Sequence, residues 1–218
     1  MNLLDVLNDS QQSTRTQGRI YGIVIGIVTD NQDPEGLGRV KVKFPWLSEE
    51  DESHWARIAL LMAGPDRGTF FLPEVDDEVL IAFEHGDVRF PYILGMLWNG
   101  QDTPPYDNSD GNNDLRVIKS RSGHELIFND NDSEGKLEIH TKAGHQVVLD
   151  DKAGSEKITV QDKSGNSIEI DSNQNAIAIK SSTKLSIESQ MIEIKAGGMM
   201  NIEASGNLVL KGAMVMIN

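Results

Sequence analysis

Pairs of apolar residues separated by one residue recur through the second half of the chain. The first pair is Leu137/Ile139 and the last is Val215/Ile217, and successive pairs start 10, 11, 10, 9, 8, 7, 8, 8 and 7 residues apart. Glycine, asparagine or serine residues stand between them. An apolar residue at every second position is typical of a strand with one buried face. The pattern predicts a ladder of very short strands joined by tight turns.

One such ribbon would not be stable alone. Each strand buries about two apolar side chains, which contributes roughly 3 to 6 kcal/mol, whereas ordering each residue costs roughly 1.5 kcal/mol. The period is also shorter than the rungs of about 20 residues in a one-chain solenoid. Copies placed around a shared axis would cover one another's stripe. We therefore predict an obligate homotrimer. Its expected core is Ile168, Ile170, Ile177, Ile179, Leu185, Ile187, Ile192, Ile194, Leu208 and Leu210.

The first half of the chain shows a different pattern, in which short β-rich runs are separated by turn signals. The runs cover residues 19–29, 39–44, 55–61, 78–83 and 92–98. Five strands with this spacing favour a small barrel of the OB type. Gly22 and Gly26 interrupt the first run and suggest bulges or sharp bends. Residues 2–8 are compatible with a short amphipathic helix.

Composition divides the chain near residue 106. All seven prolines lie at or before Pro105, and residues 101–114 are dense in acids and turn formers. We therefore predict an N-terminal helix or anchor at 1–17, an OB-fold domain at 18–100, a linker at 101–115 and a trimeric spike at 116–218. The expected fold class is all-β, an OB barrel followed by an intertwined trimeric β-helical prism.

Charge and composition exclude several classes of function. The net charge of −14 repels nucleic acid and anionic lipid headgroups. Without cysteine, disulfides and thiolate metal sites are absent. The first 18 residues lack the features of a signal peptide, and no apolar stretch approaches the roughly 20 residues of a transmembrane helix. We expect assembly in the cytoplasm and only mechanical contact with a target membrane.

Candidate catalytic and metal-binding residues are few. His54, His85 and Asp87 fall at predicted strand ends, which favours surface or structural roles over chemistry. His140 and His145 flank Gly144 and would share a turn, so a metal pair is the less favoured alternative. Paired acids such as those at 76–77 and 150–151 fit solvated turns. No nucleophile triad or phosphate loop is recognisable. We predict no enzyme activity and no cofactor.

Ordered blocks in the first half resemble a known family. They are residues 33–46, 55–60, 68–87 and 91–100, which include the runs DPEGLGRVKVKFPW and PYILGMLWNG. These blocks resemble the OB region of the VgrG and phage baseplate assembly protein V spikes. The resemblance covers about residues 17–100, and the repeat that follows is similar to the shaft of that family. It implies a trimeric central spike that a contracting sheath drives through a cell envelope, in a phage tail or an extracellular or type VI-like injection particle.

The resemblance also implies partners at both ends. Long VgrG proteins carry a hub domain before the barrel, and only about 17 residues precede it here, so we expect a separate hub and baseplate or tube proteins there. Leu3, Leu4 and Leu7 are the expected apolar anchor. Spikes that close their own tip use a His-x-His pair to bind iron, and no histidine follows His145. We therefore expect a PAAR-like tip protein on Met214, Val215, Met216, Ile217 and Asn218.

Two other functions fit a trimeric shaft. One is a phage tail fibre or adhesin with a glycan-binding face, which exposed aromatic residues along the shaft would favour; Phe128 is the only aromatic residue there. The other is a polysaccharide-depolymerising enzyme, which would need a carboxylate-lined cleft between chains.

Overall fold

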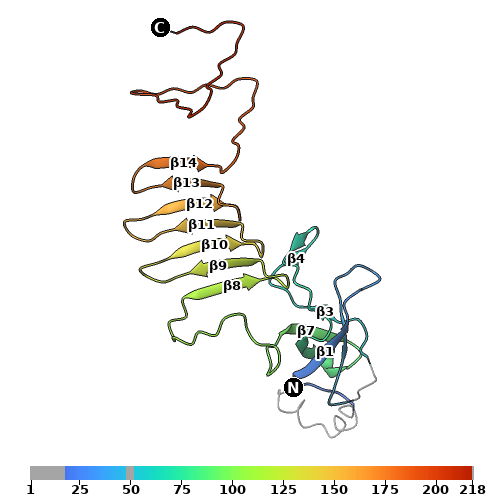
Figure 1. Cartoon of the computed structure of the whole chain (residues 1–218). Helices are drawn as coiled ribbons and strands as arrows, with labels where there is room; N and C mark the ends of the chain where they lie inside the picture. The colour runs from blue at the N-terminus through green and yellow to red at the C-terminus, as the bar shows by residue number, and fades with distance from the viewer. Residues whose placement is uncertain (1–17, 48–51, 218) are drawn as a thin grey trace, which may run out of the picture. The chain divides into compact units, whose positions relative to one another are not determined.

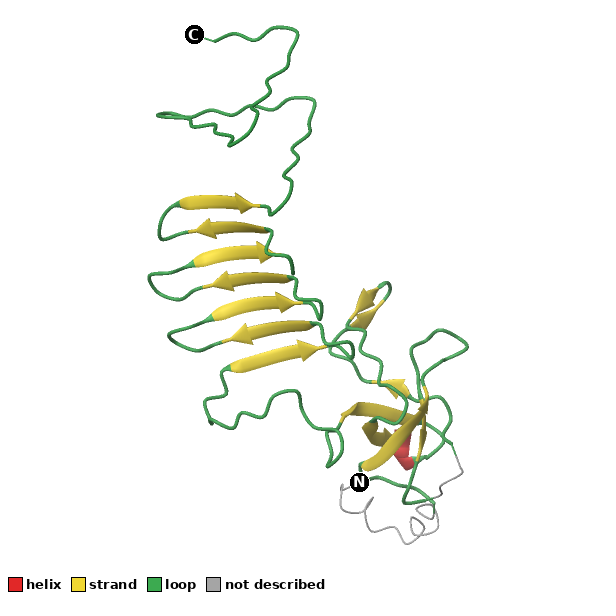
Figure 2. Cartoon of the chain, viewed as in Figure 1, coloured by secondary structure: helices red, strands yellow, loops and turns green. Residues whose placement is uncertain are grey.

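The computed structural model describes residues 18–47 and 52–217, which fall into two compact units that divide between Asp107 and Asn108. Both units consist of strands and loops (Figures 1 and 2). The one helical element in the described residues is a single 3-10 turn, η1 (Glu84–Gly86). The predicted all-β class is therefore confirmed. The expected helix at residues 2–8 lies outside the described residues.

The first unit is built on a curled five-stranded sheet. In spatial order its strands are β2 (Lys41–Lys43), β1 (Val24–Asp30), β6 (Glu78–Phe83), β7 (Pro91–Met96) and β3 (Arg57–Ile58). All neighbours are antiparallel except β3 and β7, which are parallel. Val40 and Ala56 exchange two backbone hydrogen bonds of 3.1 and 2.7 Å. This bridge joins the regions of β2 and β3, the two ends of the sheet, and closes the barrel.

The core of the described residues lies inside this barrel. Strand β6 shows why, because Val79, Ile81 and Phe83 are buried while the residues between them are half-buried. The buried hydrophobic side chains are Val28, Val40, Val42, Phe44, Ala56, Val79, Ile81, Phe83 and Ile93. Phe44 and Phe83 pack at 5.6 Å between ring centroids in a tilted geometry.

Gly26 serves a close approach rather than the bulge that the sequence suggested. A Cβ atom at this position would lie 2.5 Å from Ile81 Cδ1 and 3.1 Å from the Lys43 carbonyl oxygen. The irregularity of β1 lies instead between Val28 and Asp30, where the register to β2 shifts. Gly22 precedes the strand.

A second small sheet departs from the sequence-based expectation. Residues 55–61 form only the two-residue strand β3, and the following residues form a hairpin of β4 (Ala63–Gly64) and β5 (Arg67–Gly68). The hairpin turns at Asp66, which has a positive φ of 52°. Glycine-rich strands of two residues carry no apolar alternation, so the pattern gave no signal for them.

The second unit is a ribbon of seven antiparallel strands that pair in chain order (Figure 2). They are β8 (Leu115–Lys119), β9 (Glu125–Asn129), β10 (Lys136–His140), β11 (Gln146–Asp150), β12 (Lys157–Gln161), β13 (Ser167–Asp171) and β14 (Ala176–Lys180). Glycines with φ between +78° and +90°, at positions 123, 144, 154 and 165, reverse the chain at four of the six turns.

The predicted apolar pairs up to Ile179 lie on one face of this ribbon. The register places Leu137 opposite Leu149, Val147 opposite Val160, and Ile168 opposite Ile179. Strand β9 extends the same face with Phe128 opposite Leu137. The repeat pattern missed β8 and β9, because apolar residues occupy both faces of these strands.

The last five predicted strands are not formed in the single chain. No described residue after Lys180 belongs to a strand, and none after Asn175, glycines included, has a positive φ. Strand β14 is therefore the last strand of the ribbon in the single chain, and the later described residues pair with no strand of their own chain.

Candidate interaction surfaces

The apolar face of the ribbon is the largest candidate surface. We call it the apolar face, and it consists of Ile118, Leu126, Phe128, Leu137, Ile139, Val147, Leu149, Ile158, Val160, Ile168, Ile170, Ile177 and Ile179. Ten of these side chains are between 38% and 72% exposed in the single chain. A continuous apolar surface of this kind marks an interaction site.

The residues predicted for a trimer core fall into two groups. Ile168, Ile170, Ile177 and Ile179 belong to the apolar face and oppose one another on β13 and β14. The remaining six lie in the unpaired segment after Lys180 and are between 52% and 72% exposed; they are Leu185, Ile187, Ile192, Ile194, Leu208 and Leu210. The structure brings the first group together and leaves the second apart.

The residues expected to meet a tip protein are also exposed. Met214, Met216 and Ile217 are at least 77% exposed, and Val215 is 53% exposed. Asn218 and the expected hub anchor, Leu3, Leu4 and Leu7, lie outside the described residues.

A partly buried ion pair organises the loop before β2. Asp33 accepts hydrogen bonds from the backbone N–H groups of Glu35, Leu37 and Arg39, at 3.1, 3.1 and 3.3 Å. The Arg39 guanidinium donates two more, both 2.8 Å long. These bonds hold the pKa of Asp33 well below its usual range, and the hydrogen bonds from the Arg39 side chain have the largest effect. The arrangement is structural, since all the acceptor capacity of the carboxylate is used within the loop.

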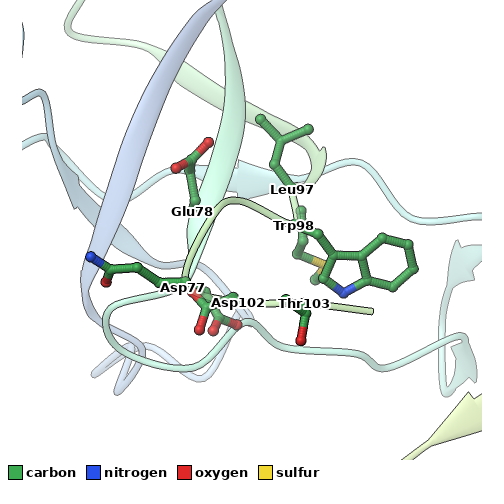
Figure 3. A pocket seen from close by; sticks show the side chains of 8 residues that line it. Asp77, Glu78, Leu97, Trp98, Asp102 and Thr103 are labelled. Atoms are coloured by element: carbon green, nitrogen blue, oxygen red, sulfur yellow. The ribbon is translucent and has the colours of Figure 1, made fainter. Parts of the chain in front are cut away.

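A cavity of about 600 Å³ lies at the edge of the barrel where β6 begins and β7 ends. Figure 3 shows the Trp98 indole on one side of it and Asp77 and Asp102 on the other. Asp77 accepts the backbone N–H of Glu74 at 2.8 Å, and Asn99 donates to Glu78 at 3.3 Å. The lining has no histidine, cysteine or lysine. It offers the negative charge of Asp77, Glu78 and Asp102 and an aromatic wall.

The barrel also exposes an apolar surface around its hairpin. A groove of about 560 Å³ runs along Leu37, Leu60, Met62, Phe70 and neighbouring residues. Leu61 beside it is 97% exposed, and Phe70 is 76% exposed. The sequence-based interpretation missed this surface. Its signal was the consecutive apolar runs at 60–63 and 70–72, which do not fit the alternation of a half-buried strand.

The histidines do not gather into a metal site. His140 pairs with Glu138 at 2.6 Å, whereas His145 accepts the backbone N–H of Lys163 at 3.3 Å through Nδ1. His85 adopts a positive φ of 50° in η1. Residues 18–47 and 52–217 contain no group of three or more histidine, aspartate or glutamate side chains placed to hold an ion.

Comparison with known proteins places the barrel in a family. The sequence model described as the type VI secretion system/phage-baseplate injector OB domain matches residues 24–98. Over these residues the barrel is similar to the injector OB domains. The predicted resemblance is confirmed, and the match spans the five strands of the barrel sheet from β1 to β7.

Curated relatives of the injector OB domain extend the likeness beyond the barrel. The spike protein VgrG3 of the type VI secretion system of Vibrio cholerae is 30% identical over 135 residues, which cover 58% of this chain. The spike protein VgrG1a of Pseudomonas aeruginosa is 30% identical over 136 residues, or 57% of this chain. A Vibrio cholerae protein named actin cross-linking toxin VgrG1 is 27% identical over 139 residues. The matched regions span only 13%, 21% and 13% of these relatives' lengths.

One further finding concerns membranes. Within the described residues, no helix is long and apolar enough to cross a bilayer.

Proposed function

We propose that this chain is the structural central spike of a contractile injection machine, which connects the tube to the tip and is driven through a target envelope. One observation carries the proposal: an injector OB domain is joined in one chain to a ribbon whose apolar face has no cover of its own. Spike proteins are also the named relatives at 30% identity. The chain acts mechanically, without catalysis or a cofactor.

The ribbon works as one side of a homotrimeric prism. Three copies are the smallest number that encloses an interior, and each presents the same apolar face to the axis. The exposure of Ile158, Ile168 and Ile177 supports this arrangement, because these side chains gain burial only from another chain.

The segment 181–217 completes the prism by exchange between copies. Its apolar pairs continue, but no described residue after Lys180 belongs to a strand of the single chain. In the assembly this segment winds onward around the axis. Its strands then find hydrogen-bonding neighbours in the other two copies, which accounts for their absence from the single chain.

The competing functions receive less support. Phe128 is the aromatic residue that an adhesin would use to bind a glycan. It lies on the apolar face, where assembly buries it. The carboxylate cavity beside Trp98 lies within the barrel of one chain, so it does not supply the inter-chain cleft of a depolymerase.

A separate PAAR-like cap occupies the tip. The exposed side chains of Met214, Met216 and Ile217 support it, because three copies would form an apolar platform and methionine adapts to a less symmetric partner. Mixing the purified assembly with a PAAR-like protein should give a stable complex. The double variant Met216→Asp/Ile217→Asp should lose it, and undiminished binding would refute this tip.

The barrel end meets a hub and the baseplate. We assign the anchoring to Leu3, Leu4 and Leu7, whose spacing would place apolar side chains on one side of a helix. Deleting residues 1–16 should leave a folded spike that does not join particles. Normal incorporation of the truncated chain would contradict this assignment.

The central proposal is tested on whole particles. Electron microscopy of particles from cells that make or lack this chain should show a central density below the tube only when the chain is present. A complemented strain is the control. Particles that assemble and keep this density without the chain would overturn the proposed function.

A further inference from the structure

The two long edges of the ribbon carry opposite charge. The turns alternate between the two sides of the ribbon, as Figure 1 shows for β8 to β14. We call the side with turns 120–124, 141–145 and 162–166 the basic edge. The side with turns 130–135 and 151–156 is the acidic edge. Each edge consists of turn tips that no other strand of the ribbon covers.

The basic edge repeats every 21 residues. Arg121, Lys142 and Lys163 each occupy the second position of a turn and are exposed. The turns are tied to one another, since the backbone N–H of Lys142 donates to His124 Nδ1 at 3.4 Å and that of Lys163 donates to His145 Nδ1 at 3.3 Å. This tie fixes the cations in one column.

Two carboxylates belong to this side as well, and both are engaged locally. Glu125 pairs with Lys119 at 2.7 Å. Asp162 accepts the backbone N–H groups of Ser164 and Asn166, at 2.8 and 2.9 Å, and its carboxylate is held within its own turn. The column of Arg121, Lys142 and Lys163 is therefore the outermost charge of the edge.

The acidic edge carries more negative than positive charge. Its first turn contains Asp130, Asp132 and Glu134, and its second contains Asp151, Lys152 and Glu156. Arg116 pairs with Asp130 at 2.7 Å and Lys152 with Glu134 at 2.8 Å, so two of the five carboxylates are compensated within the chain.

We propose that in the assembled spike the basic edge of each copy meets the acidic edge of the next copy around the threefold axis. The inference rests on the proposed homotrimer. A closed threefold rotation relates the copies without a shift along the axis, and it joins unlike edges of neighbouring copies. Contact of like edges would place cation against cation, which disfavours the alternative pairing.

The turns of the two edges also fit between one another. Basic turns follow β8, β10 and β12, whereas acidic turns follow β9 and β11. Turns on one edge recur every two strands, and turns on the opposite edge are offset by one strand. Along the ribbon, each basic turn therefore lies about 4.8 Å above one acidic turn and about 4.8 Å below the next. Lys142 is then flanked by the turns that hold Asp132 and Asp151 in the neighbouring copy. The charges set which edges pair and at what height, while the apolar face supplies most of the binding free energy.

Cross-linking tests this pairing directly, because the chain has no native cysteine. The double variant Lys142→Cys/Asp132→Cys of the full chain, oxidised mildly, should run as covalent dimers and trimers on a non-reducing gel and as monomers after reduction. Within one chain the two positions lie at opposite ends of β10, too far apart for a disulfide. The matched control Lys142→Cys/Lys163→Cys, with both cysteines on the basic edge, should stay monomeric on the same gel.

The outcomes separate this pairing from the trimer itself. Sedimentation of each variant before oxidation reports the oligomeric state, so loss of the trimer is a failure of the proposed function. A trimer in which only the control pair cross-links, or in which neither pair does, overturns the edge pairing.

Charge reversal gives a second, independent readout. Lys142→Glu/Lys163→Glu should lower the melting temperature of the assembly by a few degrees at low salt and by less at high salt. Adding Asp132→Lys and Asp151→Lys should restore it. A reversed variant as stable as the wild type, or a swap without recovery, would count against the pairing.

Discussion

Replacing Ile168 by aspartate is the sharpest test of the apolar face. Ile168 is the second residue of β13, lies opposite Val160 and Ile179, and is 47% exposed in the single chain. Fully burying such a side chain contributes about 1.5 to 3 kcal/mol. Nearly half of this burial free energy, about 1 kcal/mol per copy, is therefore gained only when the copies assemble.

The aspartate adds a larger penalty than the lost burial. An ionised carboxylate in a closed apolar interior costs several kcal/mol, and a threefold axis brings three of them together. The total is on the order of 10 kcal/mol or more per trimer, a large share of the association free energy of a nanomolar complex. Ile168→Asp should therefore abolish assembly at micromolar concentration rather than weaken it.

The control variant is Ser167→Asp. Ser167 is the preceding residue on the same strand, points to the other face, and pairs with Gln161 and Lys180, so a new carboxylate there gains an opposite charge. Sedimentation equilibrium should give a trimer for the wild type and Ser167→Asp, and a monomer for Ile168→Asp. A trimer of Ile168→Asp with wild-type circular dichroism and thermal stability would refute the argument that this face is buried.

Two further predictions concern the barrel. Gly26→Ala should destabilise it by about 1 to 3 kcal/mol in denaturant unfolding, because the new methyl group meets Ile81 Cδ1; Gly22→Ala, with nothing within 4 Å, is the control and should be near neutral. Asp33→Asn should lower the melting temperature at pH 7, because the loop loses its ion pair with Arg39. The pKa of Asp33 is depressed on folding, so its contribution is present above the unfolded value of about 4 and is lost as the pH falls below it. The melting temperature of the variant should thus fall less than that of the wild type between about pH 4 and 2, and parallel pH profiles would contradict this.

The sequence predicted those parts of the fold that depend on local alternation. Strand β6 spans the residues expected for it, and the apolar pairs from Leu137 to Ile179 oppose one another as a one-faced ribbon requires. In both cases apolar side chains stand at every second position with polar residues between them. This alternation fixes which face of the strand is buried, and with it the register of the strand.

The remaining features depend on contacts that alternation does not encode. The parallel pairing of β3 with β7 joins residues 57 and 92, and the hairpin at Ala63 to Gly68 has no alternation of apolar and polar side chains to reveal it. The charged residues of the two edges are visible in the sequence. That they separate onto two sides of the ribbon can be recognised only once the positions of the turns in the folded ribbon are known. The segment after Lys180 shows the same limit, since the pairing partners proposed for it lie in other copies of the chain.

The end of the hydrogen-bonded ribbon at Lys180 also has a kinetic consequence. Hairpins between neighbouring strands form in about 1 to 10 μs without any partner, so β8 to β14 can pair transiently in each chain before assembly. The segment 181–217 forms no strand in the single chain, and in the proposed trimer it orders only after three chains have met. Its rate of ordering should depend on protein concentration, and the spike should close from the barrel side toward the tip. Until then its exposed isoleucine, leucine and methionine side chains are the part of the newly made chain most prone to aggregation.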